Sequence, residues 1–288
     1  MKVQLDAIQF CHDPTSATRD ALTIRWDATR EVVQPEWRRG TCVGPEDSPA
    51  AYAISETRGN TITIKARLRR MVPGLDTVEI RALDPTFQNC DWLATLLDRV
   101  GLDRLPPSNP LGEVSPRCVT FGPDGLSDLE TFELAGTRFE EMGVGVWTTS
   151  WQWQYRQARG RWVDFDRSEH RTFVLLESPK EPWTQQVPPP LGLSLPRVDA
   201  LEYACRWAQG SRTRTEASAG VTRGLNGAGP NLLRYNRPGL GGPCYLGQLT
   251  LLLDRLRGGE GNGAYVNCED CADIVTTLSN LLGCELWS

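Results

Sequence analysis

Hydrophobic and polar residues alternate along several stretches in the first two thirds of the chain. The clearest is residues 61–68, where every second residue is hydrophobic, as in a strand with one buried face. The hydrophobic positions there are Ile62, Ile64, Ala66 and Leu68. A second pattern, over residues 144–165, predicts a β-hairpin. We therefore expect a first β-rich domain over residues 1–110 and a second, sandwich-like β-rich domain over residues 111–181.

Aromatic residues gather on one face of the predicted hairpin. At a period of two, the face carries Trp147, Trp151, Trp153 and Tyr155. Such a face can be a platform for a carbohydrate or a peptide, but aromatic strand faces are more often part of a core or a domain interface. We favour the structural interpretation.

The pattern changes after a proline-rich stretch, which we interpret as a linker over residues 182–197. Beyond it, hydrophobic residues recur at helical spacing, first over residues 198–208 and then over residues 246–256. The predicted fold class is therefore α+β multidomain: an N-terminal all-β region followed by a partial, mainly helical domain over residues 198–288.

The last predicted helix begins at a cysteine. Asn267 is a good N-cap, acidic residues occupy the first turn, and Gly283 is a natural stop. The hydrophobic face predicted to be buried consists of Cys268, Cys271, Ala272, Val275, Leu278 and Leu282. At the start of the helix, Cys268 would lie near unpaired N–H groups, which stabilise the thiolate form that attacks carbonyl carbon.

The pattern Cys268-x-Asp270-x-Ala272, followed by a helix that ends at Gly283, resembles the nucleophile motif of transglutaminase-like cysteine peptidases. The resemblance covers about the last third of the chain, and Asn267 replaces the glycine that usually precedes the cysteine. It implies a papain-like core, in which the nucleophile opens a helix packed on an antiparallel sheet. Residues 151–183 resemble the β-sandwich end that precedes bacterial domains of this kind.

The resemblance implies acyl transfer on a peptide or isopeptide bond. Cys268 would attack the carbonyl carbon and form a thioester, which water or an amine then resolves. Gln248, upstream on a predicted helix, is a candidate for supporting the oxyanion, because papain-like enzymes use a side chain for this purpose.

The family's histidine and its aspartate or asparagine follow the nucleophile, and this chain has only two histidines, His12 and His170, both upstream of it. We therefore expect the chain to be truncated after the nucleophile helix and to be inactive as it stands. The alternative is a non-catalytic protein-interaction module with a degenerate transglutaminase-like domain. Asp164, Asp166 and His170 on the hairpin are interpreted as a solvent-exposed face.

Other uses of the cysteines stay open. Cys268 and Cys271 have the spacing of a redox pair, but two acidic residues between them oppose thiolate formation, and no βαβ pattern precedes them. A zinc site would need Cys244 and Cys284 as further ligands, and these do not form a second close pair. Cys268 could also be a buried residue without chemistry. We expect neither a cofactor nor a metal.

Composition narrows the classes of molecule that could be partners of this chain. A net charge of −5 argues against nucleic acid, and no hydrophobic run is long enough for a membrane span. The N-terminus has no signal-peptide core, and the nine cysteines are scattered, so we expect a cytoplasmic protein. A protein or peptide is the expected substrate, and the sequence does not indicate an oligomeric state.

Overall fold

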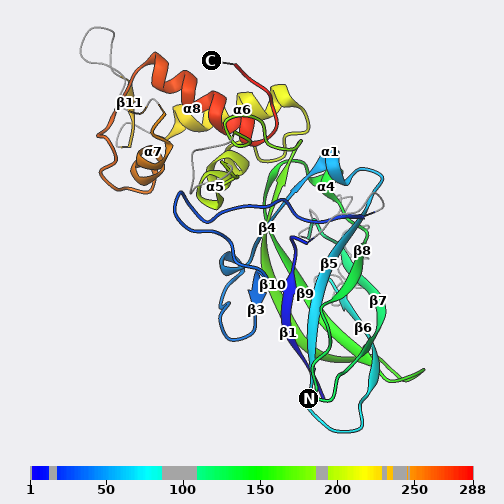
Figure 1. The fold of residues 1–288 in the computed structure, drawn as a ribbon. Coiled ribbons are helices and arrows are strands. Elements are labelled where there is room, and N and C mark those ends of the chain that lie inside the picture. Colours follow the sequence, from blue (N-terminus) through cyan, green and yellow to red (C-terminus); the bar gives the residue numbers. More distant parts are fainter. Residues whose placement is uncertain are drawn as a thin grey trace, which may run out of the picture.

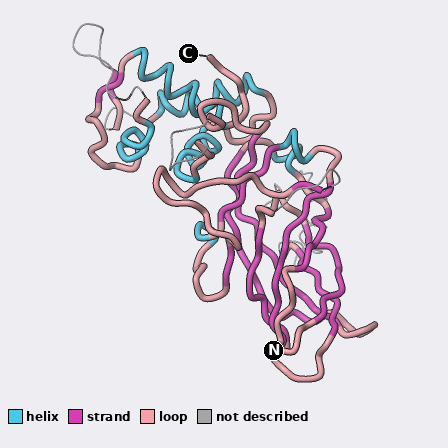
Figure 2. Tube along the Cα trace, viewed as in Figure 1, coloured by secondary structure: helices cyan, strands magenta, loops and turns pink. Residues whose placement is uncertain are grey.

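A large curled sheet dominates the computed structural model, which describes residues 2–12, 18–85, 109–185, 194–228, 232–235, 245 and 247–287. The sheet fills one end of the molecule, and the longer helices gather at the other end (Figures 1 and 2). Its strand order is β3-β1-β5-β8-β7-β6-β9-β10-β4, and the short strand β2 pairs with β5. The strands are β1 (Val3–Gln9), β2 (Thr18–Arg19), β3 (Trp37–Arg38), β4 (Pro49–Ala53), β5 (Thr61–Arg70), β6 (Thr77–Leu83), β7 (Glu113–Thr120), β8 (Glu130–Ala135), β9 (Gly145–Arg156) and β10 (Val163–Leu175).

The sheet is mixed. The pairs β10–β4 and β2–β5 are parallel, and the other pairs along the strand order are antiparallel. The sheet curls so far that β1 approaches β10, where Leu5 N donates to Asp166 Oδ2 at 3.0 Å. One hydrophobic core runs from the curled sheet into the helical end.

The helical end follows the sheet in sequence. It contains α5 (Val198–Trp207), α6 (Arg214–Gly227), α7 (Leu249–Leu256) and α8 (Cys268–Leu281), with a small parallel pair of strands, β11 (Arg234–Tyr235) and β12 (Tyr265–Val266). Helices α5, α6 and α8 pack on one another, and α5 also packs against β9 and β10. Three short helical turns, η1 (Pro45–Asp47), α1 (Ile54–Thr57) and α4 (Phe139–Met142), belong to the sheet region. No helix in the described ranges has the length and hydrophobicity of a membrane span.

The predicted fold class is wrong. The structure is mostly one large curled mixed sheet with a few helices, 33% strand against 25% helix, and not an all-β region followed by a helical half of a papain-like domain. Alternation identified β5 and the hairpin of β9 and β10, but it carries no information about which strands pair with them. In the structure, β6 from residues 1–110 lies between β7 and β9 from residues 111–181, so both ranges contribute to the same sheet.

The aromatic face of β9 lies in the core, as the structural interpretation expected. Trp151 and Trp153 are completely buried, and Tyr155 is nearly so. The indole N–H of Trp151 donates to the Gly112 carbonyl at 2.8 Å. Trp147, nearest the helical end, is half-buried.

The interpretation of His170 as part of an exposed face is wrong. A β-bulge between Asp164 and Asp166 shifts the register of β10 against β9. One extra residue reverses which side chains point inward, so Ser168 and His170 enter the core. The sequence pattern gave no sign of the bulge.

Residues 186–193 of the predicted linker lie outside the described residues. On both sides of them the chain is in contact with structured elements. The indole N–H of Trp183 donates to the Thr277 carbonyl in α8 at 2.9 Å, and Arg25 N donates to the Pro196 carbonyl at 2.8 Å. The ends of this segment are thus attached to the helical end and to the sheet region.

Candidate functional site

Helix α8 begins at Cys268, as its sequence predicts. The side chain of Asn267 accepts a hydrogen bond from Asp270 N at 2.9 Å, and the Asp270 carboxylate accepts one from Asn267 N at 3.0 Å. This reciprocal capping box satisfies two backbone donors and fixes where the helix starts. The thiol of Cys268 is therefore placed on the first residue of a well-defined helix.

Two carboxylates of α8 also hold the chain segment that precedes α7. Asp270 is completely buried, and its Oδ1 accepts a hydrogen bond from Tyr245 N at 2.6 Å. One turn later, Asp273 Oδ2 accepts one from Gly247 N at 3.0 Å. The cap residue could be read from the sequence, but these long-range contacts could not, because no local pattern marks Tyr245 as a partner of Asp270.

The buried face of α8 agrees with the predicted one only towards the end of the helix. Leu278 and Leu282 are buried as predicted, whereas Cys268 and Ala272 are exposed and Ile274 and Leu281 are buried in addition. The inward position of Asp270 explains the difference: successive helical residues are about 100° apart, so Cys268 lies on nearly the opposite side of the helix. Cys268 is therefore not buried, contrary to the interpretation of this residue as a buried cysteine.

Cys271 lies one turn after Cys268 and is half-buried. Burial raises the pKa of the Cys271 thiol above its usual value, and the nearby Asp270 and Cys268 raise it further. Cys271 is therefore a protonated thiol at neutral pH.

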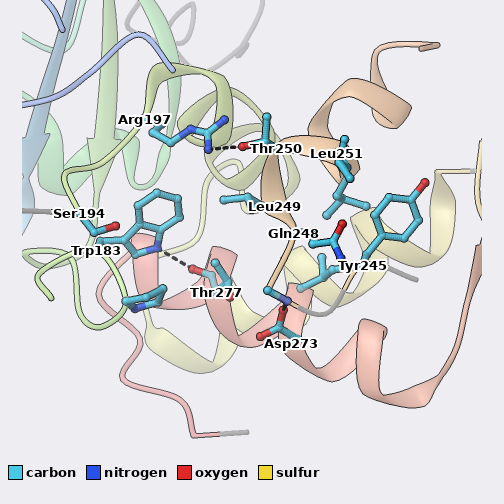
Figure 3. A pocket seen from close by; sticks show the side chains of 14 residues that line it. Trp183, Ser194, Arg197, Tyr245, Gln248, Leu249, Thr250, Leu251, Asp273 and Thr277 are labelled. Atoms are coloured by element: carbon cyan, nitrogen blue, oxygen red, sulfur yellow. Dashed lines mark hydrogen bonds between the residues drawn. The ribbon is translucent and has the colours of Figure 1, made fainter. Parts of the chain in front are cut away.

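Gln248 is not inside a helix but is the exposed N-cap residue of α7, and its side-chain oxygen accepts a hydrogen bond from Asn262 at 3.2 Å. It lines a cavity of about 530 Å³ between α7, α8 and the segments around Trp183 and Arg197 (Figure 3). The described lining residues are Pro182, Trp183, Ser194, Arg197, Tyr245, Gly247, Gln248, Leu249, Thr250, Leu251, Leu252, Asp273, Ile274 and Thr277.

The cavity and the candidate nucleophile lie on different faces of α8. The helix contributes Asp273, Ile274 and Thr277 to the lining, and Cys268 is not among the described lining residues. At about 100° per residue, Cys268 lies about 180° around the helix from the centre of these three. The described structure therefore does not bring Gln248 and Cys268 together around this cavity, and the oxyanion role of Gln248 stays a prediction.

No protein-family model matches this chain, and no curated protein does.

Both histidines are engaged in the sheet region. His170 is completely buried in β10, with Nδ1 2.9 Å from Ser48 Oγ and Nε2 2.9 Å from Ser168 Oγ. Burial lowers the pKa of His170 to about 3, so the ring is neutral at neutral pH. The Nε2 atom of His12 is 3.1 Å from Thr63 Oγ1 in β5.

Helix α8, by contrast, starts beside the β11–β12 pair, at the part of the helical end remote from the sheet (Figure 1).

The zinc interpretation depends on Cys244, which lies outside the described residues. Among the residues that are described, no group of three or more His, Cys, Asp or Glu side chains is arranged to hold a metal ion. Cys284 is buried, and its sulfur is 3.6 Å from the Arg214 carbonyl.

Proposed function

We propose that Cys268 is the nucleophile of a thiol-dependent acyl transfer on a peptide or isopeptide carbonyl, as the resemblance to transglutaminase-like cysteine peptidases implies. One observation carries the proposal: the thiol is exposed on the first residue of a helix whose start is held by the buried Asp270. A nucleophile must be accessible and fixed in position, and this arrangement supplies both.

The chemistry follows from the position at the helix N-terminus. The first-turn N–H groups of a helix and its dipole favour negative charge, both on the attacking sulfur and on the oxyanion that forms from the carbonyl. Attack by Cys268 gives a tetrahedral intermediate, and its collapse expels the amine and leaves a thioester. Water or a second amine then releases the acyl group.

The step that expels the amine needs a proton donor. His12 and His170 are held in the sheet region, so neither supplies the proton. These histidines therefore do not provide general acid–base catalysis, which is worth roughly a hundred- to ten-thousandfold in rate. An activated ester has a leaving group that departs without a proton. We therefore expect this chain to form a thioester with an activated ester but to hydrolyse no amide at a measurable rate.

The test uses an activated aryl ester and identifies the acylated residue by mass spectrometry. Cys118, on β7, is the matched internal control, because it is also exposed but lies on a strand. The helix N-terminus, worth about 0.3–1 kcal/mol, should make Cys268 react roughly two- to fivefold faster than Cys118. Cys268→Ala should remove the faster phase and Cys118→Ala should leave it intact.

Equal reaction of Cys268 and Cys118 would contradict the proposed nucleophile. Steady amide hydrolysis that Cys268→Ala abolishes would support the nucleophile but show that a proton donor had been missed.

The second candidate is a non-catalytic protein-interaction module. The observation in its favour is the engagement of both histidines with hydroxyl groups of the sheet region, remote from α8. If Cys268 acylates no faster than Cys118, this second function becomes the better explanation.

A further inference from the structure

Cys268 and Cys271 are the first and fourth residues of α8. In helix geometry, residues three apart have Cα atoms about 5 Å from each other. Disulfide-bonded cysteines have Cα separations of about 4.4–6.8 Å, so the backbone of this turn already holds the pair at a compatible distance. Both cysteines are free thiols in the structure.

The two thiols differ in a way that suits successive steps. Cys268 is exposed and open to a reagent in solution, whereas Cys271 is half-buried beside it. The thiol of Cys271, whose pKa is raised by burial and by its neighbours, does not compete for the first attack. The two acidic residues between the cysteines oppose this chemistry less than their sequence positions indicate, because Asp270 accepts hydrogen bonds from two backbone N–H groups and Glu269 is exposed to water. Cys268 is thus suited to react first, and Cys271 to react with the product.

The other described cysteines do not share this turn. Cys205 lies in α5 and Cys284 follows α8; both are buried, with their sulfurs near backbone carbonyl oxygens. Three more, Cys11, Cys42 and Cys118, belong to the sheet region. Among the described residues, Cys271 is therefore the neighbour in position to trap a modified Cys268.

We propose that Cys268 and Cys271 form a reversible disulfide that removes the nucleophile and so switches the site off. The oxidant is a low-molecular-weight disulfide such as oxidised glutathione. The thiolate of Cys268 attacks one of its sulfurs, the reagent's S–S bond breaks, and one thiolate leaves. Cys271 then gives its proton to water and attacks Cys268 Sγ, and the second thiolate leaves. Two protein thiols are oxidised, and the reagent is reduced to two thiols.

The resulting bond is easily reduced. Side chains three apart on a helix have Cβ atoms about 5–6 Å from each other. A disulfide needs about 3.8 Å, so the first turn must tighten, and strain of this kind makes a disulfide more reducible. The role as a switch rests on the proposed function of Cys268, whereas formation of the disulfide does not.

The test incubates the full chain with oxidised glutathione, digests it without reduction and maps the linkages by mass spectrometry. We expect a Cys268–Cys271 linkage that has lost two hydrogens, together with loss of Cys268 alkylation by iodoacetamide that dithiothreitol reverses. Cys271→Ser should instead accumulate a glutathione adduct on Cys268. Cys284→Ser, the matched control, should behave like the unchanged chain.

A glutathione adduct that persists on Cys268 in the unchanged chain, or a linkage from Cys268 to another cysteine, would overturn the proposal. The linkage is scored without an acyl donor, so its failure is separate from a failure of the proposed function. If the linkage forms but reduced Cys268 does not acylate faster than Cys118, the disulfide stands and its role as an activity switch is rejected.

Discussion

The polar cluster around His170 and the first turn of α8 use polar residues in opposite ways. In the sheet region, His170, Ser48 and Ser168 are all buried, and each serine is hydrogen-bonded to His170. The indole N–H of Trp153 donates to Ser168 Oγ at 2.9 Å. In α8, Asp270 is equally buried, but the residue it positions, Cys268, faces solvent.

The difference shows where reactive chemistry can lie. A buried polar group whose partners are all internal stabilises one arrangement and is closed to substrates. A buried carboxylate that holds a helix end can instead present a neighbouring side chain in a fixed, accessible place. Histidine is a common acid–base group in active sites, yet the surroundings of His170 make it structural.

The largest expected effect tests the sheet side of this comparison. Trp151→Ala should lower the free energy of unfolding by about 3–5 kcal/mol, because it empties a large buried volume and removes the donor to the Gly112 carbonyl. Trp147→Ala is the matched control. The Trp147 side chain is half-buried, and its indole N–H has no hydrogen-bond partner among the described residues. We therefore expect this substitution to lower the free energy of unfolding by about 1 kcal/mol. Urea denaturation measures both, and equal losses would contradict the placement of the core.

The next effect is a dependence of stability on pH. The pKa of His170 falls from 6.5 to about 3 on folding, so between these values the unfolded chain binds one more proton than the folded chain. This group therefore leaves stability unchanged above pH 6.5. As the pH falls from 6.5 towards 3, it removes about 1.4 kcal/mol per pH unit.

Urea midpoints recorded across this range, for the unchanged chain and for His170→Gln, isolate the contribution of His170. The variant should lose stability less steeply with falling pH, because glutamine takes up no proton. Parallel slopes for the two proteins would mean that His170 is not buried in its neutral form.

A smaller effect separates the two carboxylates of α8. Asp270→Ala leaves the N–H of Tyr245, a buried residue, without its acceptor and should cost about 1–3 kcal/mol. Asp273→Ala, the matched control, exposes the N–H of Gly247, which water can reach, so less than about 1 kcal/mol is expected. Asp270→Ala should also remove the faster acylation of Cys268, whereas Asp273→Ala should retain it. If Asp273→Ala instead cost more stability than Asp270→Ala, Asp273 would be the main anchor of the segment before α7.

Sequence reasoning succeeded where the controlling interactions are local. The start of α8 at Cys268 follows from the Asn267 cap, and the burial of Trp151 and Trp153 follows from alternation along one strand. Both patterns span only a few residues, and residues close in the sequence determine the helix start and the buried strand face.

It failed where distant parts of the chain decide. The partners of β6 and the contact between Asp270 and Tyr245 join segments that no local pattern relates. The bulge that turns His170 inward is one inserted residue within an otherwise ordinary strand. The cavity forms only where α7, α8 and the segments around Trp183 and Arg197 converge, so the sequence alone could not predict it.

The parallel pairing of β4 with β10 has a consequence for how the chain reaches its fold. Ser48, next to β4, and His170 in β10 are hydrogen-bonded although 122 residues separate them. During synthesis, β4 has no partner on this side until the ribosome has released β10, and contacts of such long range form slowly. The edge of β4 therefore remains open to unintended pairing for much of translation, until β10 has emerged.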